Sequence, residues 1–414
     1  MGGKVVLIGA LDTKGEEYLF VKNIFNKNNI QTLVIDTSVL DAPFFDPDIS
    51  SNDVALAAGS DLQTLKLNND RGKAISIMTM GAKLIIEKLS KEIQIDGVFG
   101  MGGTAGTTVA ANAMQSLTIG IPKVLVSTVA SGNTRPYVGV KDITMMYSVI
   151  DIAGINQLSS RILSNAAYAL VGMVKNISNS YNYNTSKTMI GITMFGVTTP
   201  CCNLIREQLR DLGYDVLVFH ATGAGGLAME ELIKSGFIKG VIDVTTTELA
   251  DELVGGVFSA GPDRLLAAGE AGIPQVVSVG ALDMVNFGSP ETVPETYSDR
   301  QFYQHNPTTT LMRTTIEENE TLGKRLGEKL SLSNSPVTVM FPKGGVSLLD
   351  TPGNEFNGPE HREALLKGIK LTLRKDIPLI ELDEDINHPS VATIMTQTFL
   401  RLLEGNLKED KHVH

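Results

Sequence analysis

The stretch Val98–Thr107, V-F-G-M-G-G-T-A-G-T, decides which fold class the chain is expected to have. The apolar run that leads into its glycines is typical of the end of a buried strand. The helix predicted behind the glycines has an apolar face made of Val109, Ala110, Ala113, Met114 and Leu117. The stretch therefore predicts a strand, a glycine-rich turn and a helix in succession.

The same turn is a candidate phosphate site, formed by Gly102, Gly103, Thr104, Gly106 and Thr107. Glycine allows positive φ and close approach of a ligand to the backbone. The amino end of a helix offers unpaired N–H groups and a partial positive charge, which favour phosphate. The two threonines can bond phosphate or cap the helix. Because the spacing is neither the P-loop nor the strict G-x-G-x-x-G pattern, a tight turn without a ligand is the alternative.

Length and composition restrict the class of protein. A chain of 414 residues predicts two or three domains, and 43% hydrophobic with 20% charged residues is typical of an ordered globular protein. A net charge of −11 argues against a nucleic-acid partner, which requires a basic face. The only cysteines are the adjacent Cys201 and Cys202, so no disulfide framework is expected and a reducing, cytoplasmic location fits. No signal peptide and no membrane span are expected.

Continuous apolar runs predict more buried strands of a parallel sheet in the first half of the chain. They cover Lys4–Ala10, Thr32–Asp36, Lys123–Thr128 and Ile143–Val149. Helices are expected from Glu16, near Asp53–Ala58, over Ala74–Leu89 and over Asn156–Val174, with a polar turn at Leu11–Gly15. The first strand, its helix and the second strand form a βαβ unit with a right-handed crossover.

Polar residues follow these strands at their carboxyl ends, where open parallel sheets bind ligands. Besides the glycine turn, they are Asp12, Thr13 and Lys14 after the first strand, and Thr128, Ser131, Gly132, Asn133, Thr134 and Arg135 after the fourth. Lys14 and Asp12 fit a phosphate-binding lysine beside a metal-binding carboxylate, or ordinary charge at a helix start. Asp36, about twenty residues after the first turn, is placed to bind a ribose hydroxyl or to be a solvated strand-end acid.

The polar segment Asn176–Lys187 is predicted to be a linker, because the strand pattern restarts after it. New strands are expected at Thr188–Gly196, Asp215–His220, Gly240–Thr245, Ile273–Ser278, Pro336–Phe341 and Ile377–Leu382. Helices are expected over Cys202–Leu212, Ile316–Leu330 and Val391–Leu403, and a long proline-containing loop from Ser289 to about Pro307. We therefore predict two similar α/β domains, residues 1–184 and 185–414, each a mainly parallel sheet flanked by helices.

The second domain has its own candidate site residues, His220, Glu248, His305 and Arg313. An imidazole, a guanidinium and threonine hydroxyls suit a carboxylate or phosphate, so we expect His305 and Arg313 to line one cleft with the Thr245–Glu248 loop. The alternative for Arg313 is an exposed ion pair with Glu317. No histidine pair has zinc-ligand spacing, and the two cysteines are expected to be buried small hydrophobes.

Several long runs resemble the tomato mosaic virus resistance protein-like ATP-binding family, which is largely uncharacterised. In the first half they are Gly9–Glu16, Gly102–Thr107 and Ser131–Gly154, and in the second half 193–200, 218–223, 245–253, 281–288 and 305–315. The resemblance covers nearly the whole chain. It implies two Rossmann-like domains, ATP binding in the N-terminal one and a homodimer. It implies no settled reaction, and the antiviral role belongs to one plant member.

Two functions are therefore expected as alternatives. One is an ATP- or nucleotide-dependent enzyme that acts on an unknown small molecule by phosphoryl or nucleotidyl transfer, with Mg²⁺ as an optional companion of the nucleotide. The other is a nucleotide-sensing binding protein without turnover. The second set of polar loops favours the enzyme, because a sensor has less need of them.

Overall fold

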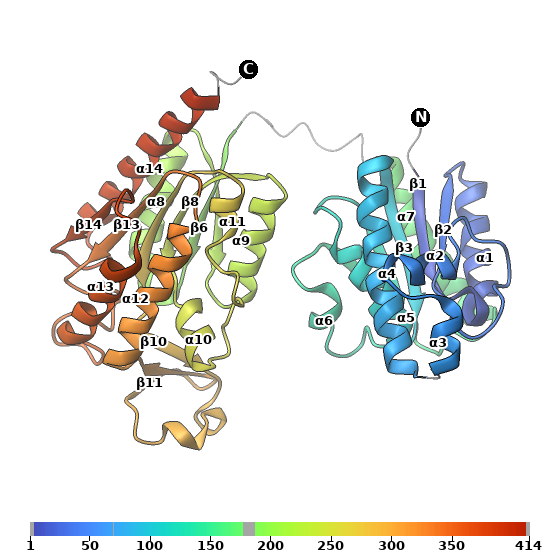
Figure 1. Ribbon diagram of the computed structural model, residues 1–414, viewed down its shortest axis with the longest axis horizontal. Helices are drawn as coiled ribbons and strands as arrows, with labels where there is room; N and C mark the ends of the chain where they lie inside the picture. The colour runs from blue at the N-terminus through green and yellow to red at the C-terminus, as the bar shows by residue number, and fades with distance from the viewer. Residues whose placement is uncertain (1–3, 69, 177–186, 411–414) are drawn as a thin grey trace. The chain divides into compact units, whose positions relative to one another are not determined.

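The computed structural model describes residues 4–68, 70–176 and 187–410. The chain forms two compact units, Met1–Tyr183 and Asn184–His414, and each contains a mainly parallel sheet between layers of helices (Figure 1). The chain is thus an α/β protein with two tandem Rossmann-like domains, as the sequence predicts. Most of the predicted linker, residues 177–186, lies outside the described residues.

The sheet of the N-terminal unit has the strand order β2-β1-β3-β4-β5, and all its neighbouring strands are parallel. Its strands are β1 (Lys4–Gly9), β2 (Thr32–Asp36), β3 (Ile95–Gly102), β4 (Lys123–Ser127) and β5 (Ile143–Tyr147). Its helices are α1 (Leu11–Lys27), α2 (Ser51–Ala57), α3 (Leu62–Asn68), α4 (Arg71–Glu92), α5 (Thr104–Gln115), α6 (Arg135–Val138) and α7 (Gln157–Asn176). Apolar side chains of α1 and α7 cover one face of this sheet, and those of α2 to α5 cover the other.

The helix after β1 begins earlier than predicted, because the expected polar turn at Leu11–Gly15 is the first turn of α1. Its first two N–H groups have acceptors from the chain after β2: Leu11 N donates to Asp36 Oδ1 at 3.1 Å and Asp12 N to Ser38 Oγ at 2.9 Å. Side chains remote in sequence therefore cap this helix, so no local capping signal marks its start.

The segment between β2 and α4 contains more helix than predicted. The short helix expected near Asp53–Ala58 is α2, which starts with a reciprocal capping box between Ser50 and Asp53. A second short helix, α3, follows it, and only Leu65 of α3 is buried. The next helix, α4, extends beyond the predicted Ala74–Leu89 at both ends, since Asp70 accepts a hydrogen bond from Lys73 N as its N-cap.

The parallel sheet of the C-terminal unit has the order β14-β13-β9-β8-β6-β7. These strands are β6 (Met189–Met194), β7 (Asp215–His220), β8 (Ile238–Thr245), β9 (Gln275–Gly280), β13 (Val337–Pro342) and β14 (Leu379–Leu382). The helices are α8 (Thr199–Asp211), α9 (Ala224–Lys234), α10 (Glu248–Val254), α11 (Ala267–Glu270), α12 (Ile316–Ser331), α13 (Pro359–Thr372) and α14 (Pro389–Asp410). Helices α8 and α14 pack on one face, and α9, α12 and α13 pack on the other.

The predicted loop from Ser289 to Pro307 is wrong in part, because this region contributes to a small antiparallel sheet. Its strands are β10 (Met284–Phe287), β11 (Phe302–Asn306) and β12 (Thr309–Arg313), in the order β10-β12-β11. Two 3₁₀ turns, Pro290–Thr292 and Glu295–Tyr297, connect β10 to β11. Pro290 begins the first turn, Pro294 precedes the second, and Pro307 lies between β11 and β12, so the prolines stay outside the strands and the sequence looks like continuous loop. In Figure 1 this antiparallel sheet lies at one end of the C-terminal unit.

Candidate functional site

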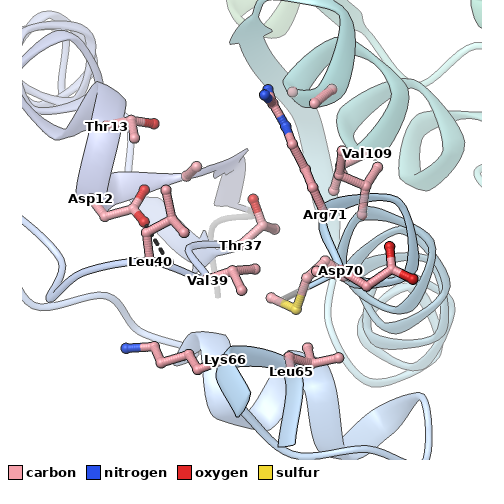
Figure 2. A pocket seen from close by; sticks show the side chains of 16 residues that line it. Asp12, Thr13, Thr37, Val39, Leu40, Leu65, Lys66, Asp70, Arg71 and Val109 are labelled. Carbon is pink, nitrogen blue, oxygen red and sulfur yellow. Dashed lines mark hydrogen bonds between the residues drawn. The ribbon is translucent and has the colours of Figure 1, made fainter. Parts of the chain in front are cut away.

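A cavity of about 620 Å³ opens in the N-terminal unit beyond the carboxyl ends of its strands (Figure 2). Strand β1 lies between β2 and β3, so the order of strand addition reverses on its two sides. Open parallel sheets bind ligands at such a reversal. Ala10, directly after β1, Thr37, directly after β2, and Gly106, in the first turn of α5, all line the cavity.

The lining divides into an apolar wall and a polar rim. The apolar wall consists of Val39, Leu40, Leu65, Ala74, Ile75, Met78 and Val109. The polar side chains are Asp12, Thr13, Thr37, Lys66, Asp70 and Arg71. A mostly apolar cavity with a few polar groups is the usual form of a small-molecule site.

The amino end of α5 borders this cavity and is open. Its first intrahelical acceptor is Gly103 O, which receives Thr107 N at 2.9 Å. The N–H groups of Thr104, Ala105 and Gly106 have no acceptor in the described part of the chain, and the N-cap Gly103 has no side chain to supply one. The amino end of α1, by contrast, is closed by Asp36 and Ser38. Of these two helix starts, only α5 leaves its amides free for an anion.

Sequence analysis missed two cationic side chains that line the cavity. They are Lys66 of α3 and Arg71 of α4. In Figure 2 the Arg71 side chain extends from α4 alongside Val109 of α5, whereas Lys66 lies on the opposite side of the cavity. Neither side chain has an ion-pair or hydrogen-bond partner in the described part of the chain. No motif surrounds either residue, so only the fold could reveal them.

The structure distributes the predicted residues of the first two loops unevenly. Asp12, Thr13 and Gly106 line the cavity. Asp12 Oδ2 also accepts the N–H groups of Leu40 and Asp41, which fixes one wall of the cavity.

Three of the remaining predicted side chains, those of Lys14, Asp36 and Thr107, have partners within the protein. The Lys14 ammonium donates to the carbonyl of Ile152. The Thr107 hydroxyl lies 2.6 Å from Ser127 Oγ and is buried. Asp36 is buried and its Oδ1 accepts the N–H of Leu11 at the start of α1, so it is not a solvated strand-end acid, and its ribose-binding role stays a prediction. Thr104 is exposed beside the open amino end.

The third predicted loop does not contribute to the cavity lining. Thr128 N donates to Gly102 O at 3.3 Å, which ties this loop to the glycine turn. Beyond it, Ser131, Gly132, Asn133 and Arg135 are exposed, and Thr134 is partly buried at the start of α6. These residues follow β4, whereas the cavity lies on the β1 and β2 side of β3.

The four candidates of the second domain have contrasting environments. Glu248 and Arg313 are buried, whereas His220, at the end of β7, and His305, on β11, are exposed. Arg313 is 5% exposed and its Nη2 lies 3.3 Å from Asp350 Oδ1, so it forms no exposed pair with Glu317. Internal ion pairs thus occupy the two charged residues, and the predicted cleft with His305 and Arg313 as neighbours in its lining has no support in their contacts.

Glu248 belongs to a buried cluster around Arg264. The Arg264 guanidinium contacts Glu248 Oε2 at 2.7 Å, Asp243 at 2.6 and 2.7 Å, and Glu230 at 3.2 Å. Glu248 Oε1 also accepts the N–H groups of Gly223 and Gly226 at the start of α9. Burial raises the pKa of Glu248, an effect that Arg264 opposes. This cluster connects α9, β8, α10 and the segment before α11, and its groups are fully engaged with one another.

In comparisons with known proteins, the models of both domains of one protein family match the chain. The N-terminal domain of the uncharacterised protein family UPF0261 matches residues 3–179, and its C-terminal domain matches residues 187–403. The chain belongs to the UPF0261 family. A UPF0261 protein of Clostridium tetani is 52% identical over 98% of this chain and 100% of its own length. The tomato (Solanum lycopersicum) ToMV resistance protein Tm-1(GCR237) is 40% identical over 96% of this chain but only 56% of its own length.

Solved structures add little to this family assignment. A UDP-N-acetylglucosamine 2-epimerase from Rickettsia bellii aligns with 98% of this UPF0261 chain and 97% of its own, at 11% identity and a TM-score of 0.24. A likeness of that size supports no conclusion about function. Within the described residues, no three histidine, cysteine or acidic side chains are grouped to hold a metal ion, and no helix is long and apolar enough to cross a membrane.

Proposed function

We propose that the cavity of the N-terminal unit binds ATP or a related nucleotide. One observation supports this most directly: a single cavity combines the open amino end of α5 and Arg71 with the apolar wall formed by Leu65, Ile75 and Met78. The phosphates would lie against the amides of Thr104, Ala105 and Gly106, and the base against the apolar wall. A Mg²⁺ ion bound to the phosphates would find the carboxylates of Asp12 and Asp70 in the same lining.

The proposal assigns phosphate binding to Arg71 in place of Lys14. The Arg71 side chain lines the cavity, whereas the Lys14 ammonium is bound to the Ile152 carbonyl. A guanidinium also offers several fixed donors to phosphate oxygens. Nucleotide binding is compatible with two functions. Our first candidate is an enzyme that uses the nucleotide to act on a small molecule, and our second is a nucleotide sensor without turnover.

Calorimetric titration of the full chain with ATP tests this proposal. We expect binding to the wild-type protein, a loss of at least about tenfold in affinity for Arg71→Met, which corresponds to one charged hydrogen bond, and little change for Lys14→Met. Absence of ATP binding to the folded wild-type chain would refute the proposal. A larger effect of Lys14→Met than of Arg71→Met would place the phosphates elsewhere in the unit. Product analysis after incubation with ATP and a pool of metabolites then distinguishes the enzyme from the sensor.

A further inference from the structure

A buried aspartate in the C-terminal unit has one oxygen without a partner. Asp283 lies between β9 and β10 and is 1% exposed. Its Oδ2 accepts the Ser347 hydroxyl at 2.7 Å, whereas its Oδ1 is buried and has no hydrogen-bond partner. An ionised carboxylate oxygen buried without a donor is costly, and the usual response of such a group is to bind a proton.

The contacts of Ser347 show which oxygen is available to the proton. Ser347 Oγ accepts the N–H groups of Leu349 at 3.0 Å and Asp350 at 3.2 Å. Its single hydrogen is therefore free to point only at Asp283 Oδ2. The remaining oxygen, Oδ1, is the one that a proton would occupy.

The charged groups around Asp283 come from three parts of the unit. Arg313 ends β12 and donates through Nη1 to the backbone carbonyl of Asp283 at 3.1 Å. Asp350 lies between β13 and α13, and Arg362 with His361 lies on α13. Burial is the main reason that the pKa of Asp283 is raised from 3.8 to about 7, the charge of Asp350 raises it further, and Arg313 opposes both.

Arg313 contacts both Asp283, at its backbone carbonyl, and Asp350, at its carboxylate. Its Nη2 reaches Asp350 Oδ1 at 3.3 Å, a long contact, while Arg362 Nη1 reaches the same oxygen at 2.8 Å. Asp350 also accepts the N–H groups of Gly358 and Val346. Asp350 therefore keeps its charge satisfied when Arg313 moves away, whereas Asp283 has no other cation within its described contacts.

We infer that Asp283 holds a proton on Oδ1 in mildly acidic solution, and that loss of this proton draws Arg313 from Asp350 toward Asp283 and loosens the attachment of the antiparallel sheet. Arg313 is the last residue of β12, the central strand of that sheet. The next residue, Thr314, donates its N–H to the Asp283 carbonyl at 3.1 Å. A shift of the guanidinium would act directly on this junction. All of these residues belong to the C-terminal unit, and none lines the proposed nucleotide cavity.

Hydrogen exchange of the Thr314 amide in the full chain provides a local test. In the folded protein the Asp283 carboxyl group holds a proton, which it would release once local opening exposed it to water. Raising the pH from 5 to 7 should therefore favour this opening. We expect the opening constant, corrected for intrinsic exchange, to rise nearly tenfold from pH 5 to pH 6, less steeply from pH 6 to pH 7, and to level off above pH 8. An opening constant independent of pH at Thr314 would overturn the inference.

Two substitutions separate the carboxyl group from general effects. Asp283→Asn places an amide where the proton is inferred and keeps an oxygen for Ser347, so it should abolish the pH dependence at Thr314. Asp299→Asn makes the same change at an exposed aspartate and should leave that dependence unchanged. A folded Asp283→Asn protein with wild-type pH dependence would contradict the inference.

A second measurement covers the case in which Asp283→Asn does not fold. The carboxyl carbon of Asp283 in the ¹³C-labelled wild-type protein should titrate with a midpoint near pH 7. A carboxyl carbon that stays in its ionised position from pH 8 down to pH 5 would overturn the inference without any variant.

Discussion

Arg264 and Asp243 form an end-on, bidentate ion pair inside the C-terminal unit, with Nη1 2.6 Å from Oδ2 and Nη2 2.7 Å from Oδ1. Both side chains are almost completely buried. Two parallel bonds fix the orientation of both planar groups, and the remaining Nε of Arg264 is directed at Glu248. One guanidinium thus faces three carboxylates, because Glu230 is also within hydrogen-bond distance.

Replacing Arg264 by methionine should destabilise the protein strongly. Methionine fills part of the volume but leaves Asp243 and Glu248 buried without their cation, and breaking a buried pair in this way costs about 3–5 kcal/mol. Urea unfolding of the full chain measures the loss. Lys88→Met, which removes the exposed pair with Glu92, is the control and should leave the midpoint nearly unchanged. Equal midpoints for both variants would contradict the importance of the cluster.

Local patterns in the sequence predict most strands of this fold, because the central strands are continuous apolar runs. The run at Lys4–Gly9 and the run before Gly100 are buried as expected. Patterns fail where a distant partner decides the structure. Leu11 is helical because Asp36 caps it from another strand, and β11 forms because β12 pairs with it, despite the prolines nearby. The helix α13 was also not predicted, although its apolar residues pack beside those of α12.

The candidate site was predictable only in part, for a related reason. Sequence analysis locates the strand ends, and of the residues that it groups there Asp12, Thr13 and Gly106 line one cavity. It could not determine which side chains point inward. Lys14 belongs to the expected turn but reaches the Ile152 carbonyl, while Arg71 enters the lining from a helix with no motif. Orientation depends on how α3 and α4 pack over the sheet.

Asp251 should titrate far above the usual range of an aspartate. Burial raises its pKa from 3.8 to about 7, although Asn286 and the Phe258 N–H donate hydrogen bonds that oppose the shift. Because the folded state holds the proton more tightly, the stabilising contribution is complete below about pH 4 and is lost as the pH rises through 7. The ¹³C carboxyl shift of Asp251 measures this directly. A midpoint below pH 5 would contradict the expected effect of burial.

The two cysteines should be inert in the native protein. Both are 1% exposed at the start of α8, and burial raises the pKa of the Cys202 thiol to about 12. Neighbouring Cys202 and Asp385 add to the effect of burial in raising the pKa of Cys201. Since the thiolate is the reactive form, a thiol reagent such as dithionitrobenzoate should modify neither residue at neutral pH. Both should react in denaturant, and rapid native labelling would show that α8 opens locally.

Neighbouring glycines of the β3–α5 turn should respond differently to valine, and this pair tests the proposed site most sharply. A Cβ on Gly103 would have only Thr128 Oγ1 nearby, at 3.9 Å, whereas a Cβ on Gly102 would lie 2.9 Å from Gly106 Cα. Gly103→Val should therefore fold, because its φ of −71° suits any residue, but its side chain would crowd the open amides of α5. We expect this variant to keep the wild-type unfolding midpoint and to lose ATP binding at least tenfold, as calorimetry and urea unfolding can show. Gly102→Val should lose stability, because the added atoms would press against the backbone of Gly106, which cannot shift as a flexible side chain can. If the folded Gly103→Val protein binds ATP with unchanged affinity, the turn is a structural connection without a phosphate, and the nucleotide does not contact the start of α5.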